Sequence, residues 1–252
     1  MSGLPEPLAY EALITLSADE WRARSAAEIG LLAQHLEPDR LDAYAPLSAF
    51  KPSPRFWPLL ALVFDLPPGL RQLVRSGNRV GKSEHGAAFV VACALIRPGS
   101  YRAVGVTYRQ MVEVVGKLLY ELIPPRALTR DSVYTTSRGW RNNLIKFRNG
   151  STIQLKSYDQ DAQAHAGSPL DGAWLDEPPP EPIYTETVAR LHDREGWLLI
   201  TATPLDQPVA YLREIIAAPD SPWRELVVPF SAESCPWYTE AQIQARIREC
   251  AL

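Results

Sequence analysis

The sequence predicts an α/β fold in which a mostly parallel central sheet carries helices on both faces. Two observations predict it. From residue 70 onward, short runs of β-forming residues alternate with helical stretches, and a glycine-rich loop joins the first such run to the first helix. Such alternation is typical of a parallel sheet with helical crossovers. The 252 residues suffice for one large domain with a small appendage.

The chain divides into two expected parts. Residues 1–49 carry apolar residues at helical spacing and are expected to form a small helical N-terminal segment. The stretch 50–58 contains three prolines, and we expect it to break regular structure and to lead into the main domain, residues 50–252.

Within the main domain, strands are expected at 71–76, 101–107, 144–158, 172–177, 197–203 and 224–230. Helices are expected at 82–96, 108–122, 181–192, 207–218 and 239–250. Inside the run 144–158, Asn149-Gly150 predicts a hairpin, because this pair tolerates the positive φ angles of a tight turn.

Composition limits the classes of function. The formal net charge is −3, so contact with nucleic acid would depend on local basic patches rather than on the whole chain. Cys93, Cys235 and Cys250 are too scattered for a disulfide framework or a metal site. The longest apolar run, 87–96, has about half the length that spans a bilayer. We therefore expect a soluble intracellular protein without a membrane partner.

The stretch "SGNRVGKS" predicts a phosphate-binding loop of the P-loop NTPase type. Its residues are Ser76, Gly77, Asn78, Arg79, Val80, Gly81, Lys82 and Ser83. The loop is one residue shorter than the usual pattern, but it follows an apolar strand and opens a helix, where backbone N–H groups face an anion. Lys82 would contact the β- and γ-phosphates of ATP, and the Ser83 hydroxyl would bind Mg²⁺. The alternative is a glycine-rich turn whose lysine only faces solvent.

An acidic pair provides the second predicted part of the site. Asp176-Glu177 ends the apolar run 172–177, which we expect to form a strand that neighbours the loop. Asp176 would hold the Mg²⁺ through its water shell, and Glu177 would orient the attacking water as a general base. The alternative is an acidic strand end that only caps the following turn.

A third predicted part ends the run 197–203. The hydroxyls of Thr201 and Thr203 would sense the γ-phosphate and pass its loss to neighbouring elements. Taken alone, these threonines are equally explained by their preference for strands.

In this order and spacing, the three parts resemble the ATPase domain of the large terminase subunit of tailed bacteriophages. The resemblance rests on "SGNRVGKS", on "IKFRNGSTIQLKSYDQ" with "GSPLDGAWLDEPPPEPIYTE", and on "LLITATPL", and it covers roughly residues 50 to 245. Terminases commonly have an irregular phosphate loop with an arginine inside it. The resemblance therefore implies that Arg79 contacts phosphate and takes part in catalysis.

The resemblance also implies a biological role. It implies a Mg²⁺-dependent ATPase that drives double-stranded DNA into a viral procapsid, in the cytoplasm of the infected bacterium and transiently docked on the procapsid. The implied partners are the portal protein and the small terminase subunit. The family works as homo-oligomeric rings, and we expect the isolated chain to be monomeric. The nuclease domain of the family would follow this region, so nuclease activity is not expected from this chain.

Rings of this kind can complete a site with an arginine from a neighbouring subunit. Relatives tend to carry an arginine or a glutamine directly before the glycine that matches Gly167, whereas here His165-Ala166 precede it. The candidates for a trans-acting arginine are Arg138, Arg141 and Arg190.

Two other functions stay open at this point. "DEPP" and "TATP" also echo helicase motifs, although the residues after 204 are too few for the second domain that such a helicase needs. A nucleotide-binding switch without turnover is the third possibility, but a pure binder has no need of Glu177.

Overall fold

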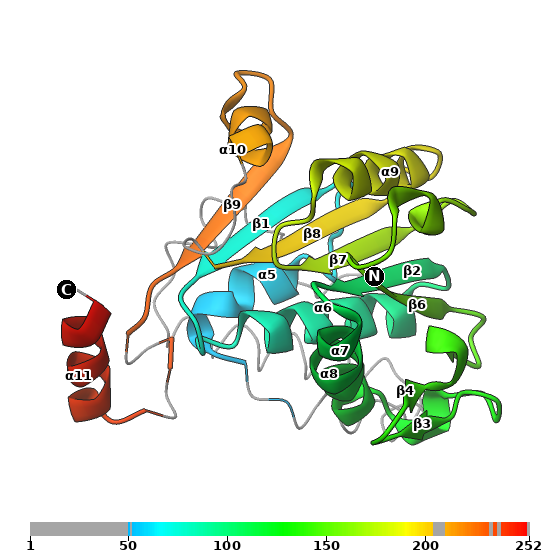
Figure 1. Ribbon diagram of the computed structural model, residues 1–252, viewed down its shortest axis with the longest axis horizontal. Coiled ribbons are helices and arrows are strands. Elements are labelled where there is room, and N and C mark those ends of the chain that lie inside the picture. Colours follow the sequence, from blue (N-terminus) through cyan, green and yellow to red (C-terminus); the bar gives the residue numbers. More distant parts are fainter. Residues whose placement is uncertain (1–49, 51, 204–209, 232–233, 236–237, 251–252) are drawn as a thin grey trace, which may run out of the picture.

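The computed structural model describes residues 50, 52–203, 210–231, 234–235 and 238–250 (Figure 1). A seven-stranded sheet forms its centre, in the order β5-β6-β2-β7-β8-β1-β9. The strands are β1 (Arg71–Ser76), β2 (Ser100–Gly105), β5 (Leu144–Lys146), β6 (Thr152–Ser157), β7 (Gly172–Asp176), β8 (Trp197–Ala202) and β9 (Trp223–Val228). All neighbouring pairs are parallel except β5 and β6. The predicted α/β fold with a mostly parallel sheet is confirmed.

Helices cover both faces of this sheet (Figure 1). The helices are α5 (Trp57–Ala61), α6 (Lys82–Ile96), α7 (Tyr108–Gln110), α8 (Gly116–Leu122), α9 (Glu181–His192), α10 (Ala210–Ala217) and α11 (Glu240–Cys250). A π-helical turn, η3 (Met111–Val115), joins α7 to α8, so the predicted helix at 108–122 is continuous but locally widened. None of the helices in the described part of the chain is long and apolar enough to cross a bilayer.

Two apolar clusters hold the layers together. On one face, α5, α6 and α8 pack against alternate strand residues such as Val74 and Trp174. On the other face, α9 and α10 pack against the intervening residues, such as Leu73 and Leu175. Successive strand residues point to opposite faces, so a strand that is covered on both sides is buried at every position and is mostly apolar. This explains why β7 and β8 are buried at every position.

The predicted hairpin at 144–158 is confirmed. β5 and β6 pair antiparallel, and Gly150 in the turn has a φ of 91°. A second, two-stranded sheet pairs β3 (Tyr134–Thr135) with β4 (Gly139–Trp140).

The prediction that 50–58 breaks regular structure is wrong from Pro54 onward. Pro54–Phe56 forms a 3-10 turn, η2, and α5 follows directly. Pro54 and Pro58 occupy the first positions of these helices, where a backbone N–H has no partner inside the helix and proline is therefore tolerated. The predicted helical segment 1–49 lies outside the described residues.

Candidate active site

The carboxyl ends of three adjacent parallel strands bring the predicted site together. β8 lies between β1 and β7, so the acidic strand is the second strand from the strand that leads into the loop. The register places Arg75 beside Ala202 and Asp176 beside Thr201. The phosphate loop, the acidic pair and the threonines therefore share one edge of the sheet, where α/β proteins bind ligands.

The loop between β1 and α6 adopts a conformation that its glycines allow. Gly81 precedes the first helical residue with a φ of 94°, a left-handed conformation that favours glycine. Arg79 is also left-handed, with a φ of 65°, and its side chain is exposed. Val80 is fully buried and anchors the loop in the core, so only its backbone can face a ligand. Gly77 has no close neighbour that a side chain would strike.

The first residues of α6 contact the acidic pair directly. The Ser83 hydroxyl donates to Asp176 Oδ1 over 2.8 Å. Lys82 Nζ lies 3.0 Å from Glu177 Oε1, and the exposed fractions of the two side chains are only 9% and 19%. The loop and the acidic pair, ninety-three residues apart for Ser83 and Asp176, thus form one polar cluster.

Burial makes Asp176 a strong candidate for holding a cation. Removal from water raises the pKa of this carboxyl group, whereas the hydrogen bonds from Ser83 and Thr201 lower it, and the burial effect prevails. The protein groups therefore stabilise the carboxylate only in part, which favours a cation beside it. In the described part of the chain, no group of three or more His, Cys, Asp or Glu side chains could enclose a metal alone. The Ser83 and Asp176 oxygens fit Mg²⁺, which takes its remaining ligands from phosphates and water.

Thr201 holds the Asp176 carboxylate in place through a hydrogen bond. Its hydroxyl donates to Asp176 Oδ1 over 2.8 Å and accepts from Trp174 Nε1 over 3.0 Å. Thr201 is fully buried. Its side chain therefore fixes the position of the carboxylate and does not face a ligand.

Thr203 connects Glu177 with the phosphate loop. Its backbone N–H donates to Glu177 Oε2 over 2.8 Å, and its hydroxyl lies 2.8 Å from Glu177 Oε1. The same hydroxyl lies 3.2 Å from Asn78 Oδ1. A change at the loop can therefore reach the carboxylate of Glu177 through one side chain.

Sequence reasoning assigned His85 no role at the site, whereas the structure places it against the end of the phosphate loop. Nδ1 lies 2.7 Å from the Gly81 carbonyl oxygen, and Nε2 lies 3.0 Å from the Ser53 N–H. A carbonyl only accepts and an N–H only donates, so the ring must be neutral with its proton on Nδ1. Phe56 stacks on the ring at a centroid distance of 3.8 Å. Burial lowers the pKa of His85 to about 4.

Tyr158 is the second residue that sequence reasoning did not place at the site. Its hydroxyl donates to the backbone carbonyl of Glu177 over 2.6 Å. Two signals were available: Tyr158 belongs to the stretch "IKFRNGSTIQLKSYDQ" that carries the family resemblance, and it directly follows β6, at the same edge of the sheet.

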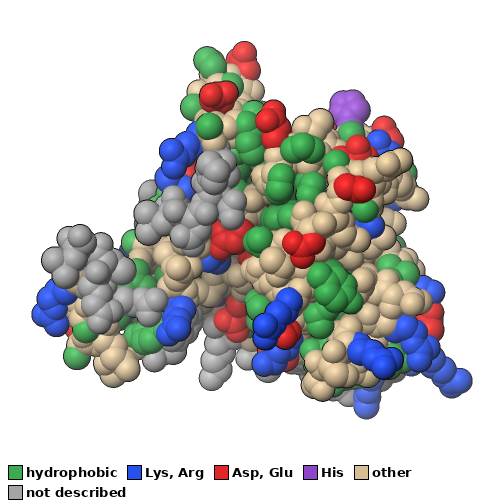
Figure 2. Space-filling view, in the orientation of Figure 1, with side chains coloured by type: hydrophobic (Ala, Val, Ile, Leu, Met, Phe, Trp, Pro, Cys, Tyr) green, Lys and Arg blue, Asp and Glu red, His purple; other side chains and the backbone are tan. Residues whose placement is uncertain are grey.

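The three candidate arginines lie away from the phosphate loop of their own chain. Arg138 and Arg141 are exposed beside β4, and Figure 2 shows several Lys and Arg side chains gathered over this lower right region. Their guanidinium groups form no hydrogen bond or ion pair with any described residue. Arg190 ends α9 at the opposite edge of the sheet, pairs with Glu186, and donates to the Gly167 carbonyl over 2.9 Å.

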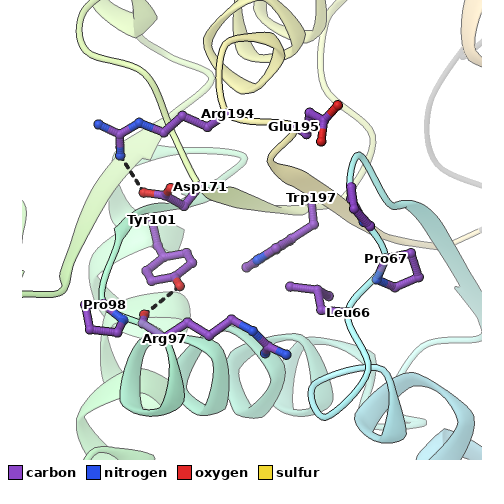
Figure 3. Close-up of a pocket in the computed structure, with 10 residues that line it drawn as sticks. Leu66, Pro67, Arg97, Pro98, Tyr101, Asp171, Arg194, Glu195 and Trp197 are labelled. Carbon is purple, nitrogen blue, oxygen red and sulfur yellow. Dashed lines mark hydrogen bonds and ion pairs between the residues drawn. The ribbon is translucent and has the colours of Figure 1, made fainter. Parts of the chain in front are cut away.

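Two cavities in the described part of the chain lie at that opposite edge. One of about 320 Å³ is lined by Tyr101 and Trp197 with Arg97 and Asp171 (Figure 3). The strands β2 and β8 begin there, whereas the polar cluster lies where they end. This cavity is therefore separate from the predicted nucleotide site.

The fold and the loop at this sheet edge define a P-loop NTPase. Residues 74–217 match the family model described as terminase large subunit, T4likevirus-type, N-terminal. This match covers more than half of the chain, and the chain belongs to that family. No curated protein sequence matches the chain.

Solved structures support the same fold. The ATPase domain of the Thermus phage P74-26 large terminase is 20% identical, with a TM-score of 0.55 over 79% of this chain and 93% of that chain. The large terminase of the thermophilic bacteriophage D6E is 16% identical, with a TM-score of 0.58 over 79% of this chain and 50% of that chain. A D6E structure in complex with ADP matches with a TM-score of 0.57 and 18% identity over 78% of this chain and 49% of its own. The chain spans about half the length of the D6E terminase.

Proposed function

We propose that this chain hydrolyses ATP with Mg²⁺ and so drives double-stranded DNA into a viral procapsid. One observation carries the proposal: Lys82 and Ser83 at the start of α6 directly contact Glu177 and Asp176 at the end of β7. Family membership and the ADP and ATP-gamma-S complexes of the D6E terminase support ATP as the nucleotide.

The contacts suggest an exchange of partners when ATP binds. Lys82 leaves Glu177 for the β- and γ-phosphates, where its charge meets a stronger anion. Glu177 keeps its two contacts with Thr203, so its carboxylate stays oriented while losing the neighbouring positive charge. It can then accept a proton from the attacking water. Arg79, exposed on the loop, would supply further charge to the phosphates.

Ser83 and Asp176 would hold the metal. Mg²⁺, when bound with the nucleotide, neutralises charge on the β- and γ-phosphate oxygens. Asp176 faces this position from a buried strand end, and Thr201 prevents its carboxylate from turning away.

Thr203 would couple the state of the site to the rest of the domain. Its hydroxyl lies within reach of both Asn78 and Glu177, so departure of the γ-phosphate can change which of them it contacts. The further partners that we propose are the portal protein, the small terminase subunit and neighbouring copies in a ring, acting in the cytoplasm of the infected host and on the procapsid.

The direct test is turnover. The chain is incubated with ATP, with and without Mg²⁺, and released phosphate is measured beside the Lys82→Ala variant. We expect Mg²⁺-dependent hydrolysis that the variant loses. Tight ATP binding with no turnover at any protein concentration would indicate a nucleotide-binding switch and contradict the proposal.

A second test separates translocation from strand separation. Blunt double-stranded DNA should stimulate hydrolysis, whereas a forked duplex should not be unwound. Unwinding of the fork at the expense of ATP would indicate a helicase instead.

A further inference from the structure

Glu177 has a backbone conformation that is unfavourable for any residue with a side chain. Its φ of 72° lies in the left-handed region, where a side chain with a Cβ crowds the following carbonyl. Pro178 follows directly and further restricts the conformations open to Glu177. Such a residue persists only where its surroundings hold it, and it commonly lies at a functional site.

Two hydrogen bonds hold this residue from opposite sides. The Glu177 N–H donates to the Thr201 carbonyl over 2.8 Å, which continues the pairing of β7 with β8. The Glu177 carbonyl accepts from the Tyr158 hydroxyl over 2.6 Å. The first bond comes from the sheet itself, whereas the second comes from a side chain on the loop after β6.

We propose that Tyr158 is a positioning residue for Glu177, whose hydroxyl holds the left-handed backbone that directs the Glu177 carboxylate toward Lys82 and Thr203. The inference rests on the proposed function, because it concerns the geometry of the proposed base. Tyr158 itself touches neither the phosphates nor the attacking water in this role.

The loop that carries Tyr158 is itself firmly held. Asp159 Oδ2 accepts from the Tyr108 N–H over 2.6 Å, at the start of α7, and Gln160 Oε1 accepts from the Ser157 N–H over 3.2 Å. Burial raises the pKa of the Tyr158 phenol well above its ordinary value, so the hydroxyl stays protonated and able to donate. The donor is therefore fixed in place relative to the ends of β2, β6 and β7.

Loss of the Tyr158 hydroxyl should lower the rate of hydrolysis by displacing the Glu177 carboxylate. Without the bond, the Glu177 backbone can relax toward a negative φ, and the side chain then swings away from Thr203. The carboxylate contacts there are 2.8 Å long, so a shift of about 1 Å breaks them and can reduce the rate by as much as about a hundredfold. Binding of ATP depends on the loop and should change little.

The test compares two tyrosines that donate to neighbouring carbonyls. Tyr158→Phe removes the bond to Glu177, and Tyr211→Phe removes a bond of the same length, 2.6 Å, to Pro179, two residues further along. Each variant keeps its ring. We expect Tyr158→Phe to lower kcat about ten- to a hundredfold with KM for ATP and the melting temperature unchanged. Tyr211→Phe should keep wild-type kcat.

Wild-type kcat in Tyr158→Phe would overturn the inference while leaving the proposed function intact. An equal loss in both variants would also overturn it, because general loosening of the segment 177–180 would then explain the effect. Absence of turnover in the wild-type chain would instead refute the proposed function, and the inference would fall with it.

A double variant gives a readout that a purely structural role would not produce. Added to Glu177→Gln, the Tyr158→Phe change should leave the residual rate within about twofold, because the carboxylate through which Tyr158 acts is already gone. Losses that multiply would show that Tyr158 acts independently of Glu177 and would overturn the inference.

Discussion

The ion pair between Lys82 and Glu177 joins two charges that the proposed mechanism uses for different tasks. In the structure each neutralises the other in a largely buried place. Lys82 thus contacts the proposed base, Glu177, although the proposed mechanism assigns its charge to the phosphates. In that mechanism the negative charges of ATP would separate the pair, so exposure of Glu177 would depend on the binding of ATP.

Replacement of Lys82 and replacement of Glu177 are expected to affect ATP binding and turnover differently. Lys82→Ala should abolish hydrolysis and weaken nucleotide binding, because the main charge on the phosphates is lost. Glu177→Gln should bind ATP normally and lose turnover about a hundredfold or more, since an amide keeps the position but cannot take the proton. Equilibrium binding measures the nucleotide affinity of each variant, and single-turnover experiments measure its rate of hydrolysis. Near-normal turnover of the Gln variant would remove Glu177 as the base.

The two proposed metal ligands, Ser83 and Asp176, give a second prediction. Ser83→Ala and Asp176→Asn should each raise the Mg²⁺ concentration for half-maximal activity several-fold, because each removes one oxygen ligand or its charge. Magnesium titrations of the ATPase rate measure this. Unchanged titrations in both variants would place the ion elsewhere.

Asp176 should also make the stability of the folded chain depend on pH. Burial raises the pKa of its carboxyl group in the folded state, so its favourable contribution is present at low pH and lost as pH rises through the folded pKa. Asp176→Asn imitates the neutral form. Without ligands it should melt higher than wild type at about pH 7.5, and the gain should shrink toward about pH 4. Equal melting temperatures at every pH would contradict this.

The element on which the site depends is the turn from β1 into α6. The start of α6 is held in place by His85, whose ring donates a hydrogen bond to the Gly81 carbonyl and accepts one from the Ser53 N–H. The segment before α5 is thereby linked to the phosphate loop across thirty-two residues of sequence. The same segment was expected to be an irregular connector, yet it forms part of the foundation of the site.

This arrangement predicts sensitivity to acid. Burial lowers the pKa of His85 to about 4 from an ordinary 6.5, so the neutral ring stabilises the fold at higher pH. Stability should fall as pH drops from 6.5 toward about 4, because the unfolded chain binds the proton first. An NMR titration that resolves His85, with exposed His192 as reference, measures it. A His85 ring that is protonated near 6.5 would contradict the burial.

The whole molecule presents its site at an open edge of the sheet, and the proposed ring would place a neighbour there. Arg138 and Arg141 flank β4, are exposed, and have no side-chain partner among the described residues, whereas Arg190 is already bonded to Glu186 and Gly167. The first two are therefore the better candidates for an arginine that acts in trans.

At this scale we expect activity per subunit to rise with protein concentration, because the isolated chain is expected to be monomeric. Mixing Glu177→Gln with an arginine variant should restore hydrolysis if the first supplies the missing arginine to the second. Such rescue with Arg138→Ala or Arg141→Ala, measured as phosphate release, would identify the residue, and Arg190→Ala serves as the comparison. Constant activity per subunit with no rescue would mean that one chain completes the site.

The sequence by itself determined most strands and helices of the main domain and the identity of the polar residues, because these follow from short-range patterns. The helix α5 and the strands β3 and β4 were not among the expected elements. The Gly81-Lys82-Ser83 triplet and the Asp176-Glu177 pair could be predicted without coordinates, since the triplet opens a helix after a strand and the pair ends an apolar strand. The same holds for the turn at Gly150. Their roles in ATP hydrolysis stay predictions.

Only the tertiary structure decided how these parts meet. The position of β8 between β1 and β7 depends on the order in which strands pair, which local patterns do not encode. The left-handed backbone of Glu177 opposes its local preference and is held by hydrogen bonds with Thr201 on β8 and with Tyr158 on the loop after β6, both distant in sequence. The contacts of His85 likewise join segments far apart in sequence. Long-range hydrogen bonds thus set the orientation of the polar groups at the site, whereas the local sequence predicts only which groups are present.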